Sequence, residues 1–118
     1  MKTYDTNKLI NDFIENAIIQ GEATYTGEYK KGNKASAKRF KIYKVMDNEI
    51  EIAKQMLDIL LEHENINVQI WAAEKALDLN YKEHQAEERL LAISKMPGAG
   101  ILGLNAELSL KARKISID

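Results

Sequence analysis

Apolar residues recur at three- and four-residue steps through most of the chain, which is the spacing of one face of an α-helix. The first series follows a candidate cap at Asp5 or Thr6 and fades between Gly21 and Gly27. Its members are Leu9, Ile10, Phe13, Ile14, Ala17 and Ile18. A second series spans residues 28–46. The side that we expect it to bury carries Ala37, Phe40, Tyr43 and Met46.

The same spacing continues in the middle of the chain. A third helix is expected to restart at Asp47 or Asn48 and to stop near the polar run 62–65. Its expected core side carries Ile50, Ala53, Met56, Leu57, Leu60 and Leu61. A fourth helix is expected over residues 66–78, only a few residues further on. Such a short link makes the two helices antiparallel neighbours.

Two more helices are expected after residue 78. Asn80 and Glu83 have the spacing of a capping box, and they would open a helix that buries Ala86, Leu90 and Ile93. Residues 96–103 hold the single proline and three of the six glycines, so we expect a break there. The last helix is expected to bury Leu104, Leu108, Ala112 and Ile115. Strict alternation is nearly absent, and the pattern predicts an all-α fold of about six helices.

The helix expected over residues 66–78 distinguishes a closed bundle from an open stack of hairpins. On a wheel of about 100° per residue, its apolar residues cover more than half the circumference. They are Ile66, Val68, Ile70, Ala72, Ala73, Ala76 and Leu77. A wide arc that contains small residues is typical of a helix packed between neighbours on both sides. We therefore expect antiparallel hairpins stacked side by side.

The residues of this segment carry a resemblance to a known family. The order Asn65, Val68, Gln69, Ala72, Ala73, Ala76 and Leu77 resembles the second helix of a HEAT repeat. Gln69 stands where that family usually has arginine. The resemblance is clear over residues 49–78 and weaker over residues 82–114. It implies that residues 1–118 form one HEAT-like domain, an α-solenoid or α-α superhelix.

The whole chain also resembles a small bacterial family of short HEAT-like domains that has no assigned function, especially over residues 71–110. Helical-repeat chains of this size recur among bacterial immunity proteins. The resemblance therefore implies a protein that binds a cognate toxin domain, such as a nuclease, and neutralises it. A general adaptor with no toxin partner is a third hypothesis, because a fold alone does not give a function.

Charge is unevenly distributed, although the formal net charge is only −1. Nine basic and five acidic residues lie in residues 1–44, against four basic and eleven acidic in residues 45–94. The basic excess gathers on the second expected helix. Its stripe consists of Lys30, Lys34, Lys38 and Lys41, with Lys31 and Lys44 close by. Such a stripe is either a solvated face or a contact for nucleic-acid phosphates.

The acidic excess surrounds the single tryptophan. Trp71 falls on the polar arc of the helix expected over 66–78, beside Asn67, Glu74, Lys75 and Asp78. An aromatic residue in that position would suit a protein interface, where its truncation often costs about 2 kcal/mol or more. Further carboxylates follow at Glu83, Glu87 and Glu88.

Our candidate contact surface for a basic protein partner consists of seven residues: Asn67, Trp71, Glu74, Asp78, Glu83, Glu87 and Glu88. Its negative charge would speed association with such a partner. Two alternatives stay open. A neighbouring helix or the N-terminal segment could cover Trp71, and each carboxylate could simply be solvated. Nucleic-acid binding through the lysine stripe is the second hypothesis. Against it, the net charge is slightly negative, and we expect Phe40 and Tyr43 to belong to the core.

No motif in the chain indicates catalysis. The chain has no cysteine, and His63 and His84 lack the spacing of a metal site. The glycines of residues 98–103 lack the lysine-serine ending of a phosphate-binding loop. We therefore expect no catalytic residue, metal or cofactor. The first twelve residues do not read as a signal peptide, and the apolar runs are four residues or shorter. These features predict a cytoplasmic protein without a membrane partner.

Overall fold

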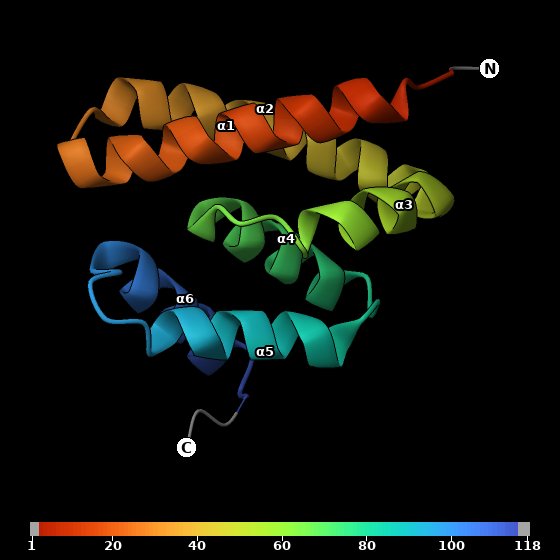
Figure 1. Ribbon diagram of the computed structural model, residues 1–118. Coiled ribbons are helices and arrows are strands. Elements are labelled where there is room, and N and C mark those ends of the chain that lie inside the picture. Colours follow the sequence, from red (N-terminus) through yellow and green to blue (C-terminus); the bar gives the residue numbers. More distant parts are fainter. Residues whose placement is uncertain (1–2, 116–118) are drawn as a thin grey trace.

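The computed structural model describes residues 3–115 and contains six α-helices and no strand within them (Figure 1). The helices are α1 (Thr6–Thr26), α2 (Tyr29–Asn48), α3 (Ile50–Leu60), α4 (Ile66–Asp78), α5 (Glu83–Ser94) and α6 (Ile101–Ala112). The expected all-α fold is confirmed. None of these helices combines the length and the apolar character needed to cross a membrane.

Side-chain caps set the start of two helices. The Asp5 carboxylate accepts a hydrogen bond from the backbone N–H of Lys8 at 3.1 Å, and α1 begins at the next residue, Thr6. The Asn65 side chain accepts from the backbone N–H groups of Asn67 and Val68 in the first turn of α4. α4 spans Ile66–Asp78, so the bounds expected for it are confirmed at both ends.

The capping box expected before α5 is wrong. Asn80 and Lys82 both have positive φ, 55° and 50°, and the chain reaches the helix through this left-handed turn. Lys82 occupies the N-cap position and makes no side-chain cap hydrogen bond. The core side of α5 is nevertheless as expected, because Ala86, Leu90 and Ile93 are buried.

The helices form a stack with α4 in its middle. α1 and α2 are the long antiparallel pair at the top of Figure 1, and α5 and α6 lie at the bottom, so that α4 lies between the two pairs. The most extensive packing joins α1 with α2 and joins α5 with both α4 and α6. The core contains Phe13, Met46, Leu57, Trp71 and Leu90, all of them fully or almost fully buried.

The expected orientation of α6 is wrong. Leu104 and Leu108 are half-exposed, and Ala112 is exposed. Leu102, Ala106 and Leu110 are buried instead. The cause is close packing at a small residue. A Cβ atom on Gly103 would lie 3.2 Å from the carbonyl oxygen of Ile93, so the glycine face of α6 meets α5, and Leu104 and Leu108 point away.

The orientation of α2 differs from expectation in the same way. Tyr43 and Met46 are buried as expected, but Phe40 is 68% exposed and Ala37 is exposed. Ala35 and Ile42 are buried in their place. Small residues again decide the contact, because a Cβ atom on Gly32 would lie 3.3 Å from the Cβ of Ala23 on α1. One of the two aromatic residues assigned to the core is thus on the surface.

Candidate binding cleft

A cleft of about 370 Å³ lies over α4, between α1 and α2 on one side and α6 on the other. Gln20 of α1 and Arg39 of α2 line the first wall, and Asn105, Leu108 and Ser109 line the second. The floor consists of the α4 residues Asn67, Ile70, Trp71 and Glu74. Three of the seven candidate contact residues therefore come together here.

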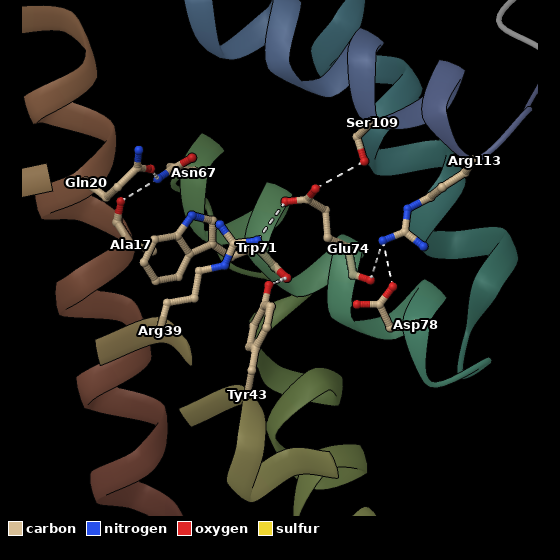
Figure 2. Close-up of polar contacts among 10 residues, drawn as sticks. All are labelled: Ala17, Gln20, Arg39, Tyr43, Asn67, Trp71, Glu74, Asp78, Ser109 and Arg113. Carbon is tan, nitrogen blue, oxygen red and sulfur yellow. Dashed lines mark hydrogen bonds and ion pairs between the residues drawn. The ribbon is translucent and has the colours of Figure 1, made fainter. Parts of the chain in front are cut away.

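Trp71 is 1% exposed, so the surface position expected for it is wrong. The ring of Phe13 meets the indole edge-on, with the centroids 5.7 Å apart. The guanidinium of Arg39 covers the indole, 4.9 Å from the centroid, as Figure 2 shows. Because Phe13 belongs to α1 and Arg39 to α2, the alternative that neighbouring helices cover this tryptophan is confirmed.

Tyr43 holds the backbone beneath the indole. Its hydroxyl donates a hydrogen bond to the carbonyl oxygen of Trp71 at 2.6 Å (Figure 2). Burial raises the pKa of the Tyr43 hydroxyl far above its usual value. Tyr43 is therefore a neutral donor at any physiological pH, and it fixes α2 to α4 beside the cleft.

The polar arc of α4 is covered because α4 is the middle helix. Asn67, Trp71 and Lys75 follow one another at steps of four, and all three are buried against α1 and α2. The Asn67 amide donates to the carbonyl oxygen of Ala17 and to Oε1 of Gln20, both at 2.7 Å. Polar character on this arc thus reflects specific contacts between helices.

Close approach of α1 and α4 at Asn67 yields a prediction for Gly21. A Cβ atom on Gly21 would lie 2.9 Å from the Cβ of Asn67, which is too close. Gly21→Ala should therefore lower the free energy of unfolding by about 1 to 2 kcal/mol, although alanine favours a helix. Urea unfolding measures the change. Glu22→Ala, at the next and exposed position, should change it by less than about 0.5 kcal/mol. A Gly21→Ala protein more stable than the wild type would contradict this packing.

The carboxylates on the cleft side of α4 are neutralised by arginines. Glu74 accepts from Arg39 at 3.4 Å and from the hydroxyl of Ser109 at 3.2 Å. Asp78 accepts from Arg113 at 2.8 Å, and the same guanidinium also donates to the carbonyl oxygen of Glu74 (Figure 2). Paired in this way, Glu74 and Asp78 join three helical segments and contribute little free negative charge.

The structure does not bring the α5 carboxylates to the cleft. Glu83 and Glu88 are exposed and Glu87 is half-buried, but α5 contributes no residue to the cleft lining. Oε1 of Glu88 lies 2.8 Å from Nε2 of His84 on the same helix. The expected acidic surface around Trp71 is therefore not one continuous patch, since its tryptophan is covered, two carboxylates are paired and three lie elsewhere.

Sequence reasoning missed Arg39 and Arg113, although composition offered a clue. The chain has three arginines against fourteen lysines. Each arginine forms an ion pair with a carboxylate of another segment, Arg39 with Glu74, Arg89 with Glu62 and Arg113 with Asp78. The planar guanidinium suits such fixed contacts better than a lysine ammonium does. Arg39 within a run of lysines was thus a candidate for a structural role.

Two surfaces outside the floor of the cleft carry exposed groups of one kind. An apolar row on α6 consists of Ile101, Leu104 and Leu108, which are 48%, 50% and 52% exposed. The lysine stripe of α2 is exposed at all four expected positions, Lys30, Lys34, Lys38 and Lys41. Comparison of the chain with models of known families, with curated proteins and with solved structures found no match.

Proposed function

We propose that this chain is a non-enzymatic protein-binding domain that acts as a bacterial immunity protein, neutralising a cognate toxin domain in the cytoplasm. The apolar row of Ile101, Leu104 and Leu108 is the observation that supports binding. These side chains recur at steps of three and four on one side of α6, and each is about half-exposed. Large apolar side chains gathered in one row on a charged surface mark an interaction site.

The apolar row continues into the cleft. Leu108 belongs to both, and Asn105 and Ser109 on the same helix offer hydrogen-bonding groups beside it. An apolar centre with polar groups at its rim is the usual composition of a protein interface. A stable interface buries about 800 Å² per partner, so the row alone is too small and the cleft must contribute. The contact is therefore centred on α6 and not on Trp71.

The arrangement in the cleft suits binding better than catalysis. Ser109 donates to Glu74, but the same carboxylate also accepts from Arg39. A nucleophilic serine needs an adjacent general base. Glu74 accepts from Arg39 through Oε1 and from Ser109 through Oε2, so these polar groups hold three helices together.

Charge does not select a basic partner at this surface, because the cleft carboxylates are paired with arginines. Among the seven candidate contact residues, the carboxylates that form no ion pair within residues 3–115 are Glu83 and Glu87, both on α5. Such charges at the edge of an interface affect the association rate more than the affinity. In this proposal, apolar contact supplies the affinity and α5 assists the encounter.

The test is co-expression with a toxin domain encoded beside this gene. Wild-type chain should restore growth, and Leu104→Asp/Leu108→Asp should not. Polar replacement of a central interface residue costs about 1 to 2 kcal/mol of binding free energy. For the two replacements together, the affinity for an inactivated toxin domain, measured by calorimetry, should fall about 100-fold. Ile59→Asp is the matched control, because Ile59 is 53% exposed on α3 and distant in the fold from α6.

The circular dichroism of all variants should match that of the wild type, since the replaced side chains are exposed. Failure of the wild-type chain to restore growth would refute the immunity function. Full rescue by the α6 variant would show that the toxin contact lies elsewhere. Binding without rescue would favour a general adaptor.

A further inference from the structure

The exposed face of α2 carries a row of uncompensated positive charge. Lys30, Lys34, Lys41 and Lys44 are all exposed and lie within about 80° of one another around the helix. Along the axis they span about 21 Å, at about 1.5 Å per residue. Of the six lysines on α2, only Lys31 is in an ion pair within residues 3–115, with Glu28 at 3.1 Å.

Two carboxylates lie along one flank of this face. Glu22 and Glu28 line a groove between α1 and α2 together with Lys31, Lys34 and Lys38. On α2 itself the only acidic residue is Asp47, which binds the buried Lys75. Lys30, Lys41 and Lys44 form no ion pair within residues 3–115, so the surface attracts anions.

Two exposed aromatic rings accompany the lysines. Phe40 is 68% exposed and lies one helical turn before Lys44, so the two side chains are neighbours on the surface. Tyr29 is 69% exposed and immediately precedes Lys30. An exposed phenylalanine forgoes the stabilisation of about 1.5 to 3 kcal/mol that its burial would contribute, and its ring is free to contact a ligand. The one aromatic residue on α2 that does pack inward near them is Tyr43.

The combination favours nucleic acid over an acidic protein. Lysine is depleted at protein interfaces, whereas it is a common ligand of phosphate. An exposed aromatic ring beside lysines can stack on a base, and such stacking contributes about 1 to 3 kcal/mol per base. Base faces are open to stacking only in a single strand, so the ring also selects the form of nucleic acid.

We infer that this face of α2 binds single-stranded nucleic acid, with Lys30, Lys34, Lys41 and Lys44 contacting successive phosphates and Phe40 stacking on a base. Tyr29 stacks on a second base at the other end of the row. The surface is separate from the apolar row of α6, so this inference does not depend on the proposed immunity function.

Fluorescence anisotropy with a short labelled oligothymidylate tests it. For single strands, a plot of the logarithm of the affinity against the logarithm of the salt concentration has a slope of about −0.7 for each phosphate contacted. Lys34→Gln/Lys41→Gln should therefore make the slope shallower by about 1.4. Phe40→Ala should weaken binding about tenfold without changing the slope, because it removes stacking and no charge.

Lys95→Gln/Lys114→Gln is the matched control, since it removes the same charge from exposed positions outside α2 and should leave affinity and slope unchanged. Equal losses in both lysine double variants would overturn the inference, as would an oligothymidylate that does not bind at low salt. If a duplex binds as tightly and Phe40→Ala has no effect, stacking is refuted. If polyglutamate binds more tightly than the oligonucleotide, the partner is an acidic protein surface.

Discussion

Trp71→Ala should lower the free energy of unfolding by about 4 kcal/mol, the cost typical of removing a fully buried large aromatic side chain. Trp71 is 1% exposed and packs edge-on against Phe13. Its loss would leave a cavity in the middle of the stack and remove the ring beneath Arg39. Because domains of this size are stable by about 5 to 15 kcal/mol, the variant would lose a large part of its stability.

Urea unfolding followed by circular dichroism measures this effect, with a lower midpoint and an unchanged slope. Trp71→Phe should cost less, because a ring would still pack against Phe13. Phe40→Ala is the matched control, an aromatic truncation at a 68% exposed site on the neighbouring helix α2, and should cost less than about 0.5 kcal/mol. Equal stability of Trp71→Ala and wild type, with weakened partner binding, would instead place Trp71 at an interface.

Helix positions were predictable because their determinants are local. The cap at Asn65 and the apolar arc of residues 66–78 lie within one segment, and α4 matches the expected bounds. The start of α1 after Asp5 and its end at Gly27, which has φ of 79°, are also local features. The turn before α5 is the exception, since its left-handed residues are Asn80 and Lys82 and not glycines.

Which side of a helix faces the core was harder to predict, because a helix can carry two apolar rows. On α6, Leu104 and Leu108 formed the row that we expected to be buried, while Leu102, Ala106 and Leu110 formed the row that is buried. The choice depends on how closely α5 can approach at Gly103, which is a property of two helices together. The same reasoning explains why Phe40 on α2 is exposed.

The cleft was least predictable, because its residues come from four helices. The helical wheel separated the apolar arc of α4 from a polar arc and placed Trp71 on the polar one. In a middle helix, however, a neighbour also covers the polar arc, and Asn67 and Lys75 are 3% and 4% exposed. Buried polar residues then mark the contact between helices, and a wheel of one helix cannot distinguish them from a solvated face.

Lys75 provides the second large stability effect that we expect. Its ammonium forms an ion pair with Asp47 at the end of α2 and lies 4.7 Å from the ring centroid of Tyr43. The Lys75 side chain is 4% exposed, whereas that of Asp47 is 55% exposed. Asp47→Ala should therefore lower the free energy of unfolding by about 2 kcal/mol, since it leaves a buried ammonium without its counter-ion.

A double variant separates charge from packing. Lys75→Met keeps most of the volume and removes the ammonium, so Asp47→Ala/Lys75→Met should be nearly as stable as the wild type. The exposed pair Lys54 and Glu51, at 3.9 Å, is the control, and Glu51→Ala should cost less than about 1 kcal/mol. If the double variant is no more stable than Asp47→Ala alone, Asp47 acts through something other than Lys75. Restored stability would show that this ion pair adds little net stability. The buried lysine would then require a carboxylate at the end of α2. This requirement would fix the register of α2 against α4 beside the cleft.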